Sequence, residues 1–152
     1  MTRNHMATLS YESRIELAPG AEDNGLASML SALILQNLKD KPKKRDDFAK
    51  LRGRVAIVAE DAAVSLTLVF EGNMLTIYDG IVGVPDVTVR ADSEDIVQLS
   101  LVELTSFLGL PNPRGAALRE VVQKSKHGKI RVFGALLHWP LVLRLTRLMS
   151  IH

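Results

Sequence analysis

The chain has 152 residues, of which 47% are apolar and 24% are charged, and it carries a formal net charge of +2. This length predicts a single domain that buries a hydrophobic core, and the apolar fraction excludes a disordered chain. The basic excess is too small for a nucleic-acid-binding face, so we expect no nucleic acid partner. Cysteine is absent, which excludes disulfides, thiol catalysis and cysteine-bound metal.

The N-terminus is polar and lacks the apolar run of a signal peptide. The longest uncharged apolar stretches, near residues 26–38 and 136–143, are shorter than the roughly 18 residues that a membrane span needs. A cysteine-free chain also suits a reducing compartment. We therefore expect a soluble, cytoplasmic protein.

Residues 1–24 are predicted to form a mobile leader with local order around residues 11–17, because Pro19-Gly20 interrupts the chain before any strong periodicity begins. Apolar residues then recur at helical spacing over residues 26–38 and predict the first helix, with Asp23 or Asn24 as its N-cap.

The basic run at residues 39–45 contains Pro42, which ends the first helix. We interpret this run as a solvated linker, with a weak contact to anionic lipid head groups as the alternative. A short helical turn is expected to follow around Phe48 and Leu51.

Three strands are expected at residues 55–60, 64–70 and 75–78, where β-branched and alternating apolar residues dominate. Gly72-Asn73 predicts a two-residue type II′ turn, and Glu60-Asp61 predicts a looser one. The three strands should therefore form a meander.

A fourth strand is expected at residues 87–90, directly behind Pro85, which suits an edge or the start of a strand. A helix capped by Asp92 or Ser93 should follow, with Ile96, Leu99, Leu104, Phe107 and Leu108 on its apolar side. The last elements expected are a helix over residues 114–126, a fifth strand at 129–133 and a Leu-rich helix with Pro140 in its first turn.

This order of elements predicts an α+β fold, with a five-stranded, mostly antiparallel sheet covered by helices. After the leader, residues 25–152 should form one domain.

Three motifs occur in order: Pro85-Asp86-Val87-Thr88-Val89, Ser93-Glu94-Asp95, and residues 128–134 with the sequence Gly-Lys-Ile-Arg-Val-Phe-Gly. With the expected strands, they give residues 48–149 a pattern that resembles the sterol carrier protein type 2 family. In that family, the corresponding segments enter the fourth strand, open the next helix and form the last strand.

The resemblance implies an apolar tunnel between the sheet and the C-terminal helices, holding a fatty acyl chain, a sterol or another lipid. Ordinary core packing is the alternative for each candidate residue, because the same periodicity produces a filled core. The candidate lipid-binding residues are Leu66, Leu68, Ile77, Ile96, Leu99, Phe107, Leu137, Leu141, Leu145 and Leu148.

The sequence has no nucleophile elbow, zinc-binding His-Glu-x-x-His, phosphate loop or dinucleotide fingerprint. The acidic trio Asp92, Glu94 and Asp95 fits helix capping better than acid–base catalysis. His138 fits a surface or capping role better than a contact with a lipid carboxylate. We expect no enzymatic activity, no metal and no cofactor.

The apolar surface of the terminal helix is wider than one core-facing stripe requires. Our first hypothesis is non-enzymatic lipid carriage. The second is an accessory protein that presents a hydrophobic intermediate, such as a quinone precursor, to enzymes. The third is an interaction module that uses the terminal helix. A homodimer and transient contact with a membrane surface remain open, and Arg144 and Arg147 either meet a head group or keep the helix surface wet.

Overall fold

The computed structural model describes residues 14–99 and 131–149, and the side chains of residues 97–99 are not described. Its elements, in chain order, are β1 (Ile15–Leu17), η2 (Ala21–Asp23), α2 (Gly25–Asp40), α3 (Pro42–Lys50), β2 (Arg52–Ala59), β3 (Val64–Glu71), β4 (Leu75–Asp79), β5 (Val87–Ala91), α4 (Ser93–Leu99), β6 (Arg131–Phe133) and α6 (Trp139–Met149). The predicted helix at 114–126 lies outside the described residues.

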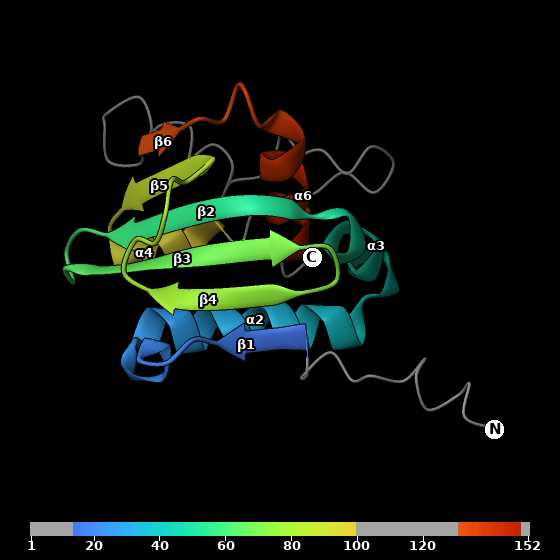
Figure 1. Ribbon diagram of the computed structural model, residues 1–152, viewed down its shortest axis with the longest axis horizontal. Coiled ribbons are helices and arrows are strands. Elements are labelled where there is room, and N and C mark those ends of the chain that lie inside the picture. The colour runs from blue at the N-terminus through green and yellow to red at the C-terminus, as the bar shows by residue number, and fades with distance from the viewer. Residues whose placement is uncertain (1–13, 100–130, 150–152) are drawn as a thin grey trace.

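The described strands form one six-stranded sheet in the order β1-β4-β3-β2-β5-β6 (Figure 1). Strands β2, β3 and β4 form the predicted antiparallel meander. However, β1 pairs with β4 in parallel and β5 pairs with β2 in parallel. The α+β class is confirmed, but the prediction of five mostly antiparallel strands is wrong, because the sheet is mixed and has a sixth strand.

The extra strand comes from the predicted leader. Ile15–Leu17 pairs with Leu75–Ile77, and the Ala18 amide donates to the carbonyl of Ile77 at 2.9 Å. The described part of the leader, from residue 14 onward, therefore belongs to the domain. The three residues of β1 are too few to give a clear alternating pattern in the sequence.

Asn24 caps α2, as one of the two predicted alternatives. Its Oδ1 accepts from the Ala27 amide at 3.1 Å, while its Nδ2 donates to the Ser65 carbonyl and to Asp79 Oδ1, both at 2.9 Å. One buried side chain thus satisfies a free helix amide and ties the start of α2 to β3 and β4.

The basic run is not a solvated linker along its whole length. Pro42 occupies the first turn of α3, where its missing amide hydrogen costs nothing, and Lys44 is buried on this helix. The guanidinium of Arg45 donates to the carbonyls of Leu38 and Lys39 at the end of α2. Two cations of the run therefore act inside the fold.

The β3–β4 turn also differs from the prediction. Gly72 and Asn73 both have positive φ, at 68° and 61°, and the Glu71 amide donates to the Met74 carbonyl at 3.0 Å. Two central residues with positive φ indicate a type I′ turn, whereas type II′ needs only the first. Asparagine tolerates this conformation, so the type II′ prediction is wrong.

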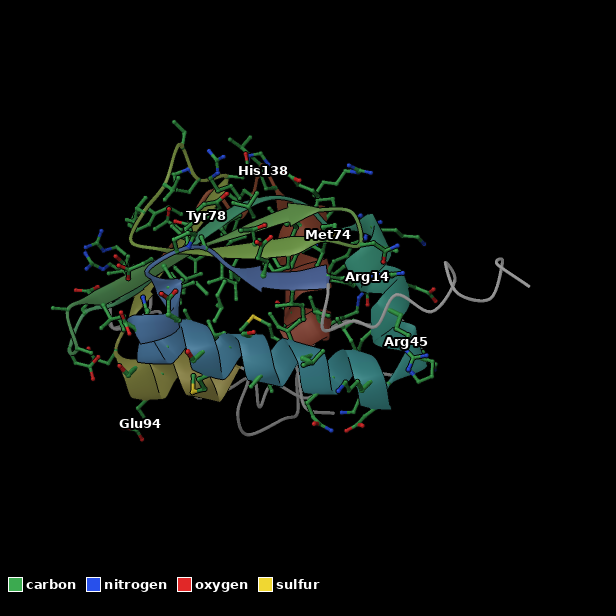
Figure 2. The ribbon with its side chains drawn as sticks, turned by 60° about the horizontal axis from the view of Figure 1, so that its bottom comes forward. Arg14, Arg45, Met74, Tyr78, Glu94 and His138 are labelled. Carbon is green, nitrogen blue, oxygen red and sulfur yellow. The ribbon has the colours of Figure 1, made fainter. Side chains whose placement is uncertain are left out.

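The helices cover one face of the sheet, as the rotated view shows (Figure 2). Apolar side chains of β2, β3, β4 and β5 meet α2 and α6 on that face and form the core. The opposite face is partly covered by the β4–β5 loop, because Thr67 Oγ1 donates to the Gly80 carbonyl at 2.8 Å and accepts from the Val82 amide at 3.0 Å. Thr67 is fully buried as a result.

Candidate functional site

An apolar cavity of about 130 Å³ lies between α6 and the β2–β5 half of the sheet. Parallel pairing sets Val55 opposite Val87 and Ile57 opposite Val89, so these four side chains form its floor. The remaining lining residues come from α4, β6 and α6, and they are Ile96, Val132, Leu141, Val142, Leu145, Thr146 and Met149.

Three of the predicted lipid-binding residues line this cavity: Ile96, Leu141 and Leu145. Leu141 and Leu145 are one turn apart on α6, which places both side chains on the face that meets the sheet. Both are 8% exposed.

Four other candidates, Leu66, Leu68, Ile77 and Leu148, are fully buried in the core and do not line the cavity. The first three belong to β3 and β4, in the half of the sheet on which α2 packs. For these residues the structure favours the alternative of ordinary core packing.

Of the last three candidates, one is exposed and two have side chains that the structure does not describe. Leu137 lies in the turn before α6, is 86% exposed and does not line the cavity, so its role in lipid binding stays a prediction. Leu99 ends α4, but its side chain is not described, and Phe107 lies outside the described residues.

The sequence reasoning missed Val55, Ile57, Val87 and Val89 as cavity residues. It recognised the first of their strands from its β-branched residues and the second from its alternation, and these patterns were the available signal. What it lacked was the parallel β2–β5 pairing, which brings the two alternating faces together.

Gly53 sets the distance between β2 and the first turn of α6. Its φ is 140°, and a Cβ at this position would lie 2.8 Å from Leu141 Cδ2 and 3.1 Å from Asp86 Oδ2. A side chain would therefore push against the cavity wall and strain the backbone.

Gly134 has a similar role after β6. Its φ is 83°, and a Cβ there would lie 2.2 Å from the Asp86 carbonyl oxygen. The final glycine of the motif at residues 128–134 thus lets the chain turn closely over β5 toward α6.

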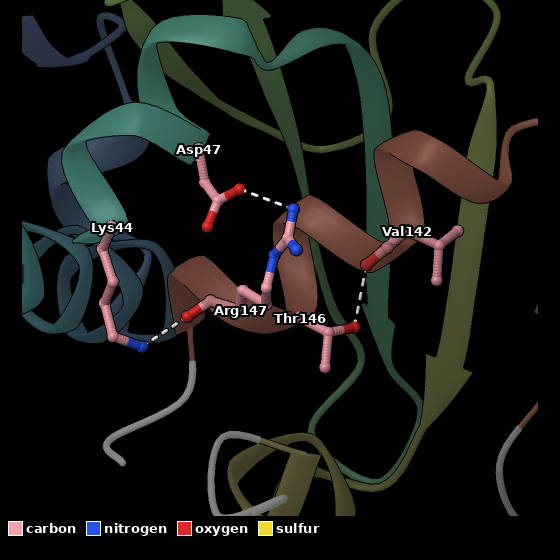
Figure 3. A network of polar contacts seen from close by, with 5 residues as sticks. All are labelled: Lys44, Asp47, Val142, Thr146 and Arg147. Atoms are coloured by element: carbon pink, nitrogen blue, oxygen red, sulfur yellow. Dashed lines mark hydrogen bonds and ion pairs between the residues drawn. The ribbon is translucent and has the colours of Figure 1, made fainter. Parts of the chain in front are cut away.

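A polar network holds the other end of α6 (Figure 3). Lys44 Nζ on α3 donates to the Arg147 carbonyl, and Asn37 Nδ2 on α2 donates to the Leu148 carbonyl at 2.9 Å. The guanidinium of Arg147 donates to Asp47 Oδ1 at 2.7 Å. These contacts satisfy carbonyls that have no partner within the helix and place a cation at its negative end.

Burial dominates the electrostatics of this network. It lowers the pKa of Lys44 from 10.5 to about 8, with a further decrease from Lys41 and an opposing effect from Asp47. Burial also raises the pKa of Asp47, although Arg147 counteracts it. None of these groups lines the cavity, so we regard the network as a support for α6.

The predicted acidic trio does not reach the cavity either. Asp95 is buried, whereas Asp92 and Glu94 are exposed. The start of α4 is fixed instead by Asp61, whose Oδ1 accepts from the Ser93 amide at 2.8 Å and from its hydroxyl at 2.9 Å, which lowers the pKa of Asp61.

Within residues 14–99 and 131–149, no cluster of three or more side chains has the composition of a metal site. The same residues include no helix with the length and apolarity needed to cross a bilayer.

The model of the SCP-2 sterol transfer family matches residues 32–107, which is half of the chain. The chain belongs to the SCP-2 sterol transfer family. The match includes β2–β5 and α4, and thus the floor of the cavity. The resemblance carried by the sequence motifs is therefore confirmed. No curated protein matches the chain.

Among solved structures, the UbiJ-SCP2 ubiquinone synthesis protein shares the fold. It aligns with 84% of this chain and 95% of its own, at 18% identity and a TM-score of 0.56. A crystal structure of sterol carrier protein 2 is a weaker neighbour, which covers 78% of this chain and 88% of its own, at 13% identity and a TM-score of 0.46.

Proposed function

We propose that the chain binds and carries a long apolar lipid, with part of the lipid held in the cavity between α6 and the β2–β5 half of the sheet. The observation that carries the proposal is the lining of this cavity, which is apolar apart from the Thr146 side chain. Thr146 Oγ1 donates to the Val142 carbonyl at 2.8 Å within α6, so its polar hydrogen is already satisfied.

In this proposal, hydrophobic burial supplies most of the binding free energy. Each buried methylene contributes about 0.8 kcal/mol before the costs of association and ordering are subtracted. Such binding needs no catalytic group, and we propose that the chain is not an enzyme.

The cavity is smaller than a whole acyl chain requires. An engineered protein cavity of about 150 Å³ holds a benzene molecule, and the present one has about 130 Å³. We therefore propose that α6 moves away from β5 as the lipid enters, while the contacts at the end of α6 to Lys44 and Asn37 keep the helix attached.

A second candidate function is the presentation of a quinone precursor to enzymes. Its motivation is the name of the UbiJ-SCP2 ubiquinone synthesis protein, and 18% identity supports only a shared fold with that protein. The third hypothesis, a terminal helix that binds a partner, loses part of its surface, because Leu141, Leu145, Leu148 and Met149 are buried within the chain.

Native mass spectrometry and probe titration test the proposal. Gently purified protein should retain a lipid mass, and it should bind a fluorescent fatty acid, a fluorescent sterol or an isoprenoid quinone analogue saturably. Selective binding of the quinone analogue would favour the second candidate. No saturable uptake of any probe would overturn lipid carriage, and a stable dimer without ligand would favour the interaction module.

The variant Leu145→Trp tests whether the bound probe occupies the cavity. If Leu145 faces usable space, the larger side chain should reduce probe affinity with little change in melting temperature. If it faces a filled core, overpacking should cost about 1–3 kcal/mol of stability instead. Leu143→Trp, on the same helix but outside the cavity, is the control. A large fall in melting temperature with unchanged binding per folded molecule would refute the assignment.

A further inference from the structure

The segment from the last residue of β6 to the first residue of α6 exposes four large apolar side chains, which we call the connector patch. Phe133 is 53% exposed, Leu136 94%, Leu137 86% and Trp139 50%. Leu136 and Leu137 are more exposed than the other large apolar residues of the described chain. The patch is thus apolar surface that the described fold leaves uncovered.

A groove of about 320 Å³ adjoins this patch and is lined by Lys50, Arg52, Arg144 and His138, among other residues. We call it the basic groove. Leu137 belongs to both surfaces, so the exposed apolar side chains and the cations are neighbours. Among the described residues, no ion pair joins Lys50, Arg52 or Arg144 to a carboxylate.

Three carboxylates approach this region, and one of them, Asp47, is paired with an arginine outside the groove and also interacts electrostatically with Arg144. Asp86 lies 3.9 Å from His138 Nε2 and accepts from the Arg54 amide at 2.9 Å, while Asp47 binds Arg147. Glu71 is the cross-strand neighbour of Arg52. Lys50, Arg52 and Arg144 outnumber Asp86 and Glu71, the two nearby carboxylates that no arginine or lysine pairs with among the described residues, so the groove keeps a small positive balance.

We propose that the connector patch and the basic groove dock on an anionic lipid bilayer. Tryptophan and leucine side chains enter the head-group boundary, and nearby lysine and arginine side chains bind anionic lipids. A second copy of this chain fits less well, because a symmetric contact through the same patch would bring the two sets of cations together.

The position of Leu141 connects this surface with the cavity. Leu141 lines the basic groove on one side and the apolar cavity on the other. Docking would therefore place the first turn of α6 next to the bilayer, where a lipid could pass between membrane and cavity. Docking itself concerns only the outside of the protein, so it stands or falls independently of what the cavity holds.

Trp139 makes the docking directly measurable, because it is the only tryptophan in the chain. Vesicles of phosphatidylcholine mixed with phosphatidylglycerol should shift its fluorescence to shorter wavelength and carry the protein into the pellet on sedimentation. Pure phosphatidylcholine vesicles should bind less, and added salt should weaken binding. Equal binding to both vesicle types, or no shift with either, would overturn the proposal.

Two variants locate the surface. Neutralising two cations in Lys50→Gln/Arg52→Gln should lower partitioning roughly 25-fold, at about fivefold for each cation. Leu136→Ser should lower it by about tenfold, because an exposed leucine loses its burial in the head-group boundary. The controls are Lys43→Gln for charge and Met29→Ser for an exposed apolar side chain, both outside the groove.

Each variant should keep the melting temperature and the uptake of soluble fluorescent probe of the parent protein. Loss of vesicle binding with retained probe uptake would therefore support a docking surface separate from the cavity. If the controls reduced vesicle binding as strongly as Lys50→Gln/Arg52→Gln and Leu136→Ser, the proposed location would be wrong. A dimer that already buries Trp139 in the absence of vesicles would also refute the proposal.

Discussion

The side chains of Asn37 and Lys44 complete the hydrogen bonding at the end of α6. The last carbonyls of α6 have no intrahelical partners, and these two side chains, from different helices, donate to two of them. The wall of the cavity is thereby fixed at the end opposite to Gly53. Neither residue is distinguished in the sequence, because a polar residue in an amphipathic helix ordinarily faces solvent.

Asn37→Ala should lower the free energy of unfolding by about 1–3 kcal/mol. Alanine cannot donate to the Leu148 carbonyl, which then stays buried without this partner. Denaturant unfolding measures the change. Gln36→Ala, at the neighbouring exposed position, is the control and should stay within about 0.5 kcal/mol of the parent. Equal stability of the two variants would show that the Leu148 carbonyl does not depend on Asn37.

Lys44 should make the free energy of unfolding increase with pH above about pH 8. Its pKa is about 8 in the folded chain and 10.5 as a free side chain. Between these values, the unfolded chain binds a proton that the folded chain does not, so the contribution of Lys44 to stability rises with pH in this window. Below about pH 8, both states carry the charge and the contribution is constant.

Unfolding curves of the parent and of Lys44→Met, measured between about pH 7 and about pH 10, test whether the contribution of Lys44 to stability rises with pH. The parent should gain stability relative to the variant as the pH increases above 8. A difference that stays constant, or that shrinks with pH, would contradict the lowered pKa.

At the scale of elements, the sequence identified most of the secondary structure because the periodicities were strong. The meander, the α2 helix and the terminal helix with Pro140 in its first turn are all found. Pairing between strands distant in sequence was not predictable in the same way, because alternation shows which face of a strand is apolar but not which strand lies next to it. The positions of β1 and β5 beside β4 and β2 depend on the whole fold.

Gly53 links two elements, and Gly53→Ala should disturb both. An alanine must adopt a φ of 140°, which is unfavourable for a residue with a Cβ, and its methyl group would press on Leu141. We expect a loss of about 1–3 kcal/mol in stability and weaker probe binding.

Gly25→Ala is the matched control for this change. Gly25 begins α2, has no positive φ, and would have no neighbouring atom within 4 Å of an added Cβ. Alanine there should be neutral or stabilise the protein by up to about 1 kcal/mol. If thermal melts gave the same result for Gly53→Ala, close packing of α6 on β2 would not require glycine.

At the scale of the whole molecule, the sequence motifs identified the family, whereas only three of the ten candidate lipid-binding residues line the cavity. Leucines on β3 and β4 looked like tunnel residues, yet α2 covers them and they pack in the core. The cavity lies over β2 and β5, which become neighbours only through the parallel crossover. Of the predicted residues that do line it, Ile96 belongs to α4, which the Ser93-Glu94-Asp95 motif opens, and Leu141 and Leu145 belong to the predicted Leu-rich terminal helix.

The domain boundary gives the last prediction. The sequence predicts a domain of residues 25–152, but β1 covers the edge of β4, and Asn24 joins α2 to β3 and β4. A chain of residues 25–152 should therefore be less stable than the full chain and more prone to associate, because the edge of β4 would be open to pairing.

A chain of residues 20–152 retains Asn24 but lacks β1, so it separates the effect of losing β1 from the effect of losing Asn24. Thermal melts should rank the full chain above 20–152 and 20–152 above 25–152, and light scattering should show association for both truncated chains. If 25–152 melted with the full chain and stayed monodisperse, β1 and Asn24 would be dispensable, and a boundary at residue 25 would describe the folding unit correctly.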